Sequence, residues 1–356
     1  MAIILKTEGQ GYYMEPNRQN HKNEEKYSVD GYIGTYYSEK SKGIYHFTLD
    51  PESGRLTEPE LFYEAPNAKW VSLQGCSMVF PIEKQGRAGT CFLEVRDGLP
   101  VRAEVILEEE QTPCYILQEG HWVYTANYHE GNVMIYRLEN GRPDLLKRIE
   151  NGTKAGCHQV MLHENYLMVP CLEQHRIRLF DTGNGFASAG EIRFPEGSGP
   201  RHGVFNRDHT KLYVVSEWSN ELFIFQVHDG EFILLQTMSV LPDRRDKVGK
   251  EAAAAIRLAG DERFLYISVR GSDDLVVVNV DGDQAAVIQH ISCGGVHPRD
   301  MVFCGDGRFL LVANRFGGGI VSMERDCKNG LLTNRRHSVS MPEGVSLALV
   351  QRCINS

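Results

Sequence analysis

Short segments in which apolar and polar positions alternate recur along this chain, separated by turns rich in Gly, Asn, Asp and Ser. The stretch 199–227 contains three of them, at residues 201–205, 211–216 and 221–227. Alternation over four to eight residues between turn residues predicts β-strands. Because strands joined by short turns run antiparallel, Arg201 and His202 at the start of the first strand lie at the same end of the sheet as Glu217 after the second.

The same strand pattern repeats at a nearly constant interval. Segments equivalent to 212–215 begin at residues 32, 77, 123, 167, 265 and 310, and from residue 123 onward they are separated by 44, 45, 53 and 45 residues. Most copies are preceded by an inner strand, such as 158–162 or 299–303, and followed by a turn and a partner strand. A period of about 40 to 50 residues is typical of one four-stranded propeller blade.

The two ends of the pattern complement each other. The copy at Tyr32 has no inner strand before it, whereas 344–350 forms an inner strand with no partner after it. Joining them gives an all-β, seven-bladed β-propeller of four-stranded blades, whose ring is closed by N- and C-terminal strands that share one blade. We expect one propeller domain over residues 28–356 after a poorly ordered polar leader at 1–27. The segment 77–95 matches the repeat least well, and the insertion 242–251 predicts a loop near the site.

Composition excludes several classes of protein. Lys and Arg number 38 against 47 Asp and Glu, a net charge of -9, which argues against nucleic acid or an anionic membrane as the main partner. With no signal peptide and no long apolar run, we expect a soluble cytoplasmic protein. The nine cysteines include no Cys-x-x-Cys pair, which predicts reduced, mostly buried thiols.

The propeller topology gathers polar residues on one face around the central channel. Inner strands begin at His158, at Arg201 with His202, and at Arg299 with Asp300; second strands end at Asn127 and Tyr128, Glu217, Arg270, and Asn314 with Arg315. Four arginines, two histidines and one isolated carboxylate suit an anionic small molecule whose reaction develops negative charge on oxygen. His158 and Glu217 are the candidates for proton transfer. Each residue alone also has a structural interpretation: Glu217 as a solvated turn residue, and Arg299 with Asp300 as an ion pair that ties blades together.

Other motifs are weaker. The glycines of 316–320 fit a hairpin turn, and no phosphate loop, dinucleotide fingerprint or nucleophile elbow is present. Glu108, Glu109 and Glu110 fit a solvated turn. Because cations outnumber carboxylates at the channel mouth, we expect no metal and no cofactor.

Several motifs resemble the bacterial seven-bladed propeller 6-phosphogluconolactonases, whose wider family includes fungal carboxymuconate-lactonizing enzymes. They are Gly199-Pro-Arg-His-Gly-Val-Phe205, Tyr213-Val-Val-Ser-Glu217, His297-Pro-Arg-Asp300 and the segments 33–36, 42–45, 156–160 and 264–271. The resemblance extends from about Tyr27 to the C-terminus and implies a metal-independent lactonase. It places His158, Arg201, Glu217 and Arg270 at the positions of that family's catalytic group. The chain departs from the family at the sixth inner strand, where Ala255 and Arg257 replace an acidic residue and a histidine.

The resulting hypothesis is hydrolysis of 6-phosphoglucono-δ-lactone to 6-phosphogluconate, a step of the pentose phosphate pathway. Water attacks the lactone carbonyl with either His158 or Glu217 as general base, while Arg201 and Arg270 stabilise the oxyanion. Asn127, His202, Arg299 and Arg315 are the predicted substrate-binding residues. A lactonase or cycloisomerase acting on another carboxylated lactone, or a non-catalytic binding scaffold, stays open. The expected partner is a small anionic sugar lactone, and both a monomer and a weak dimer are compatible with the sequence.

Overall fold

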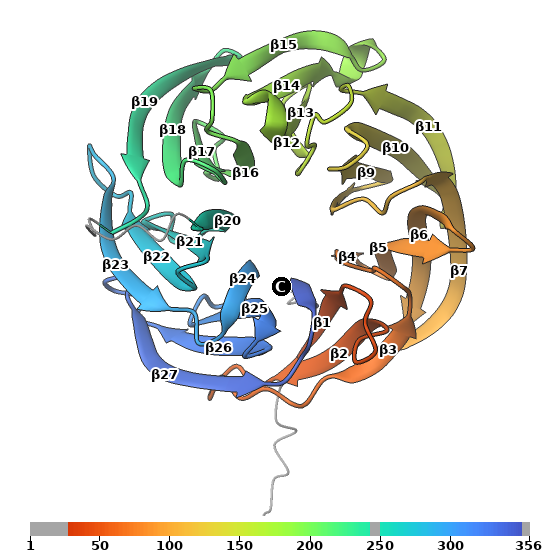
Figure 1. Cartoon of the computed structure of the whole chain (residues 1–356), viewed down its shortest axis with the longest axis horizontal. Coiled ribbons are helices and arrows are strands. Elements are labelled where there is room, and N and C mark those ends of the chain that lie inside the picture. The colour runs from red at the N-terminus through yellow and green to blue at the C-terminus, as the bar shows by residue number, and fades with distance from the viewer. Residues whose placement is uncertain (1–27, 243–249, 351–356) are drawn as a thin grey trace, which may run out of the picture.

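Seven four-stranded antiparallel sheets are arranged as blades around a central axis (Figure 1). The computed structural model describes residues 28–242 and 250–350. The predicted leader at 1–27 lies outside the described residues, and so does most of the predicted loop at 242–251. The fold is therefore the predicted all-β, seven-bladed propeller.

We number the blades in chain order. Blade 1 consists of β28 (Gly344–Leu349), β1 (Val29–Thr35), β2 (Gly43–Leu49) and β3 (Glu60–Glu64), and blade 2 of β4 (Ser72–Gln74), β5 (Ser77–Lys84), β6 (Arg87–Arg96) and β7 (Leu99–Glu109). Blade 3 consists of β8 (Tyr115–Glu119), β9 (Trp122–Asn127), β10 (Asn132–Glu139) and β11 (Arg142–Glu150). Blade 4 consists of β12 (Met161–His163), β13 (Tyr166–Cys171), β14 (Arg176–Asp181) and β15 (Ala187–Arg193). Blade 5 consists of β16 (Pro200–Phe205), β17 (Lys211–Ser216), β18 (Glu221–His228) and β19 (Glu231–Ser239). Blade 6 consists of β20 (Ala252–Leu258), β21 (Phe264–Arg270), β22 (Asp274–Asn279) and β23 (Ala286–Ser292). Blade 7 consists of β24 (Val296–Phe303), β25 (Phe309–Gly317), β26 (Ile320–Arg325) and β27 (Leu332–Val339).

The ring closes where the last strand meets the first. β28 pairs antiparallel with β1, and Ile33 lies opposite Leu347. Figure 1 shows β28 at the inner end of blade 1, beside β1. The prediction that the two ends of the pattern share one blade is confirmed.

The core lies between the blades. Phe47 and Ile33 of blade 1 pack in one buried cluster with Phe309 and Leu311 of blade 7, and the other blade contacts repeat this arrangement. Alternate residues of each central strand face the two neighbouring blades, which explains why these strands have almost continuous apolar sequences.

The eight cysteines of the described chain form no disulfide, and five of them are buried.

Two local features differ from the sequence-based expectation. The segment that matched the repeat least well forms the regular hairpin of β5 and β6, whose strands are longer than the repeat predicts. The inner strand predicted at 158–162 begins only at Met161. His158 precedes it and keeps one ladder-like bond, from its backbone N–H to the carbonyl of Pro170 at 3.1 Å.

Asp300 connects three blades. Its Oδ1 binds Arg257 Nη2 of blade 6 at 2.5 Å, and its Oδ2 accepts the backbone N–H of Leu347 in blade 1 at 2.9 Å. The alternative interpretation, in which Arg299 and Asp300 form an ion pair that ties blades together, is wrong about the partner: Asp300 does connect blades, but its ion pair is with Arg257. The departure from the family pattern at Arg257 has this structural role.

We expect Asp300→Ala to lower the free energy of unfolding by about 2–4 kcal/mol, because it leaves Arg257 and a buried backbone N–H without their acceptor. Chemical denaturation checks this. The control is Asp281→Ala, which removes the exposed partner of Arg263 and should cost no more than about 0.5 kcal/mol. Equal losses in the two variants would contradict the proposed connection.

Candidate functional site

Three of the predicted residues form one ion-paired group at the channel mouth. Glu217 follows β17, where Ser216 lies opposite Pro200 at the start of β16. Its Oε2 accepts from Arg201 Nε at 2.9 Å and from Arg270 Nη2 at 2.8 Å. The antiparallel topology thus brings these residues together as predicted.

Glu217 is neither an isolated carboxylate nor a solvated turn residue. Its side chain is only 18% exposed and lies between two guanidinium groups. Burial alone would raise the pKa of Glu217, but Arg201, Arg270 and Arg299 outweigh this effect and hold the pKa below its usual value. A carboxylate stabilised in its charged form is a poor proton acceptor, so Glu217 is better suited to hold the two arginines.

His158 and His202 form a buried imidazole pair. His202 Nε2 lies 3.2 Å from His158 Nδ1, and His202 is 1% exposed. Burial and the charge of Arg201 lower the pKa of both histidines well below the usual value, so both are neutral at pH 7. When Nδ1–H of His158 donates a hydrogen bond to His202, Nε2 of His158 keeps a lone pair and can accept a proton.

A small cavity lies beside this pair. It has a volume of about 20 Å³, sufficient for one water molecule. The residues that line it come from blades on all sides of the channel: Tyr36, Lys69, Trp70, Cys114, His158, Arg201, His202, Arg299 and Val345. Trp70 is fixed by a 2.9 Å hydrogen bond from its indole Nε1 to the carbonyl of Ile116.

Arg299 and Arg315 also lie at the mouth but differ in their partners. Arg315 Nε binds Glu343 Oε2 at 2.7 Å, and its guanidinium lies 4.1 Å from the ring centroid of Tyr36. In the described chain, the side chain of Arg299 makes no ion pair and no hydrogen bond. It is therefore a cation available to a ligand.

Asn127 does not join this group. Its Nδ2 donates to Glu109 Oε1 at 2.8 Å and to the carbonyl of Gln111 at 2.7 Å, while its Oδ1 accepts the backbone N–H groups of His129 and Glu130. These bonds fix the turn after β9 and occupy both ends of the Asn127 amide, so this amide is not free for the predicted substrate binding.

The prediction of a solvated turn at 108–110 is wrong for Glu109, which is 1% exposed and whose pKa is raised by burial to about 7.

The sequence assigned no role in the site to several residues at the mouth, among them Tyr36, Lys69, Trp70 and His297. His297 precedes Arg299 by two residues and adopts a left-handed backbone conformation with φ 65°. Burial, with Arg299 and Arg270 nearby, lowers the pKa of His297 to about 4. The position of His297 at the start of an inner strand was a signal that could have identified it.

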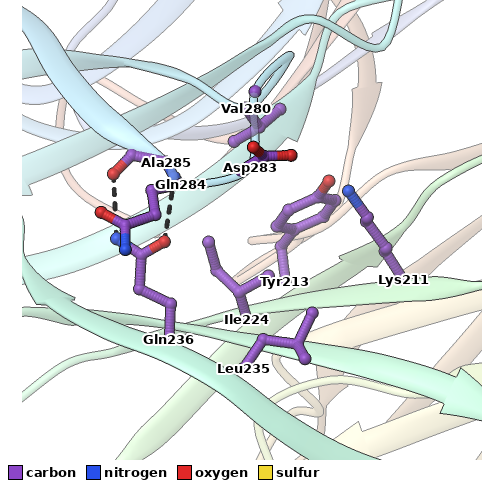
Figure 2. A pocket seen from close by; sticks show the side chains of 10 residues that line it. Lys211, Tyr213, Ile224, Leu235, Gln236, Val280, Asp283, Gln284 and Ala285 are labelled. Carbon is purple, nitrogen blue, oxygen red and sulfur yellow. Dashed lines mark hydrogen bonds between the residues drawn. The ribbon is translucent and has the colours of Figure 1, made fainter.

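A larger pocket of about 460 Å³ lies between blades 5 and 6, away from this group. Figure 2 shows that Gln236 spans it toward Ala285, with one hydrogen bond from each end of its amide, both 2.9 Å. Lys211 and Asp283 are its charged residues. It contains no cluster of groups for proton transfer, whereas the channel mouth combines two neutral histidines with arginines and a carboxylate, which makes the mouth the candidate active site.

Among residues 28–242 and 250–350, no three His, Cys, Asp or Glu side chains converge as a metal site would require. In the same part of the chain, no helix has the length and apolarity needed to cross a membrane.

Comparison with known proteins identifies the family. A family model described as lactonase, seven-bladed β-propeller, matches residues 30–350. The chain belongs to this lactonase family. Membership of the lactonase family indicates a hydrolase.

Individual relatives of this lactonase-family propeller cover almost its whole length. The 6-phosphogluconolactonase of Bacillus subtilis strain 168 is 30% identical over 345 residues, which span 90% of this chain and 98% of that protein. A protein from Lactobacillus plantarum of known crystal structure is 25% identical, with a TM-score of 0.85 over 91% of this chain and 100% of that one. The periplasmic gluconolactonase of Pseudomonas aeruginosa has the same fold at 22% identity, with a TM-score of 0.81 over 91% of this chain and 99% of that one.

We expect Glu217→Gln to lower both stability and turnover. Loss of the carboxylate leaves buried Arg201 without its counter-ion, which should cost about 2–4 kcal/mol of unfolding free energy. Turnover on the substrate should fall about 10²-fold or more as the arginines lose their alignment. Thermal denaturation and steady-state kinetics measure the two effects.

The matched control is Glu191→Gln. Glu191 also binds two arginines, Arg176 at 2.8 Å and Arg193 at 2.7 Å, but on the outer strands of blade 4. Its loss should cost about 1 kcal/mol or less and leave turnover unchanged. A Glu217→Gln protein of unchanged stability but lost turnover would instead identify Glu217 as the general base.

His297 should make stability depend on pH in the acid range. The unfolded chain protonates this imidazole below about pH 6.5, whereas the folded protein does so only near pH 4. Because the unfolded state binds more protons in this interval, the free energy of unfolding rises with pH across it and is lost as pH falls. Denaturation at several pH values should show a shallower acid loss for His297→Gln than for the exposed control His228→Gln. Identical slopes would contradict this assignment.

Proposed function

We propose that this protein hydrolyses a phosphorylated sugar lactone, 6-phosphoglucono-δ-lactone, to the open-chain acid. The observation that carries the proposal is a neutral imidazole, His158, beside a water-sized cavity in a mouth rich in arginine. Membership of the lactonase family and the 6-phosphogluconolactonase from Bacillus subtilis support the same reaction.

His158 is the proposed general base. A water molecule in the cavity attacks the lactone carbonyl and transfers a proton to His158 Nε2. His202 Nε2 accepts a hydrogen bond from Nδ1–H of His158 across their 3.2 Å contact and so orients the ring. The role of His202 is therefore positioning, in place of the substrate binding expected from the sequence.

The arginines stabilise the negative charge that develops. Arg201 lines the cavity beside His158, and Arg270 binds the same carboxylate oxygen of Glu217 as Arg201 does. Their charge favours the tetrahedral oxyanion. When this intermediate collapses, the bond from the carbonyl carbon to the ring oxygen breaks, and the ring oxygen takes the proton back from His158. Arg299 and Arg315 remain to bind the anionic group of the substrate.

The direct test is lactone hydrolysis with and without the 6-phosphate, corrected for spontaneous ring opening. We expect hydrolysis of the phosphorylated lactone with a kcat/KM at least about 10-fold above that of glucono-δ-lactone, since one charge-assisted contact contributes this much. Activity should survive a metal chelator, because only side chains of the chain act in this mechanism.

Three outcomes would contradict the proposal. Equal rates on the two lactones would favour a different lactone as substrate, and a carboxylated lactone is the next to assay. A rate no higher than background on every lactone would favour a binding scaffold. Complete loss with the chelator and recovery with calcium would point to a metal-dependent reaction.

A further inference from the structure

The charges at the mouth do not balance within the protein. Glu217 is shared by Arg201 and Arg270, and Glu343 is bound to Arg315. In the described chain, Arg299 and Lys69 make no ion pair and their side chains make no hydrogen bond. Two cations thus have no carboxylate within ion-pair distance, although Arg299 acts electrostatically on Glu217 and Lys69 on Glu109, and the histidines beside them are neutral.

Lys69 is the more unusual of the two. It lies in the connection from β3 to β4, lines the central cavity with Arg299 and His158, and is 8% exposed. Its Nζ lies 5.7 Å from the ring centroid of Tyr36, the same ring that Arg315 covers. An ammonium group buried to this extent without an anion is unfavourable.

The backbone before Lys69 holds it in this position. Asn67 has a left-handed conformation with φ 59°, accepts the backbone N–H of Tyr37 at 3.1 Å and donates to Glu83 Oε2 at 2.7 Å. The backbone N–H of Lys69 in turn donates to the carbonyl of Asn67 at 2.7 Å. The hydrogen bonds of this turn therefore fix the backbone position of Lys69 beside the cavity.

Nearby carboxyl groups do not replace the missing anion. Lys69 acts electrostatically on the buried Glu109, but burial raises the pKa of Glu109 to about 7, and Glu109 Oε1 accepts a hydrogen bond from Asn127. It carries only part of a negative charge at neutral pH and makes no ion pair with Lys69.

We propose that Lys69 and Arg299 together form a subsite for a dianionic group, the phosphate monoester of the substrate. A phosphate monoester carries a charge between about -1.5 and -2 at pH 7, which matches two unpaired cations, whereas a single carboxylate neutralises only one. This inference rests on the proposed function for the identity of the lactone, but it makes a separate claim about binding. Lys69 is then the residue that distinguishes phosphorylated from unphosphorylated sugar acids.

The test is calorimetric titration of the intact protein with 6-phosphogluconate and with gluconate, neither of which requires turnover. The wild-type protein should bind 6-phosphogluconate more tightly. Lys69→Met should weaken this binding about 10- to 100-fold and leave gluconate binding unchanged. Lys69→Arg should recover part of the loss, because it keeps the charge.

Thermal denaturation without ligand separates this role from a structural one. Removing an unpaired buried cation should leave the melting temperature of Lys69→Met equal to or above that of the wild type, whereas a structural lysine would show a decrease. The control Lys147→Met removes an exposed lysine from outer strand β11, with its 3.0 Å hydrogen bond to the carbonyl of Gly185, and should leave binding unchanged and the melting temperature nearly so.

Unchanged 6-phosphogluconate binding in Lys69→Met, or no preference for 6-phosphogluconate in the wild type, would overturn the subsite. An equal loss of binding for 6-phosphogluconate and gluconate would overturn it too. The proposed reaction fails independently, when the wild-type protein binds 6-phosphogluconate through Lys69 and yet hydrolyses no lactone.

Discussion

The antiparallel pairing of β28 with β1 is the constraint on which this molecule depends. Without it, blade 1 has three strands, and the edge of β1 is open to pairing with other chains. The same pairing places Gly344 opposite Thr35, so that Glu343 and Tyr36 meet beside Arg315. Closure of the ring and construction of the mouth are therefore one structural event.

Charge compensation then determines what the mouth can do. Carboxylates hold the arginines that need fixed positions, as Glu217 does for Arg201 and Arg270. Burial and the surrounding cations keep His158 and His202 neutral, which allows His158 to accept a proton at pH 7. Lys69 and Arg299, which no carboxylate holds within ion-pair distance, are the cations that we propose for the phosphate of the substrate.

The sequence predicted the blades well because strand alternation and turn residues are local features. It also brought Arg201, Glu217 and Arg270 to one place, since the ends of antiparallel strands must meet there. It could not predict that Asp300 binds Arg257, 43 residues away and in another blade. For the same reason the sequence predicted Asn127 as a substrate-binding residue, although its amide donates to Glu109, which is 18 residues away in another blade. Lys69 was missed because it precedes the short strand β4, in a turn whose conformation depends on contacts with Tyr37 and Glu83.

Ring closure also orders the events of biosynthesis. β28 follows every other described strand, so its partner β1 cannot complete blade 1 until all of those strands have been made. Contacts between residues this far apart form slowly. Glu343, which contacts Arg315 and Tyr36, directly precedes β28, so we expect these contacts to form together with the closing pair of strands. The residues that we propose for catalysis, His158, Arg201 and Arg270, are thus all made before the strand that closes the ring around them.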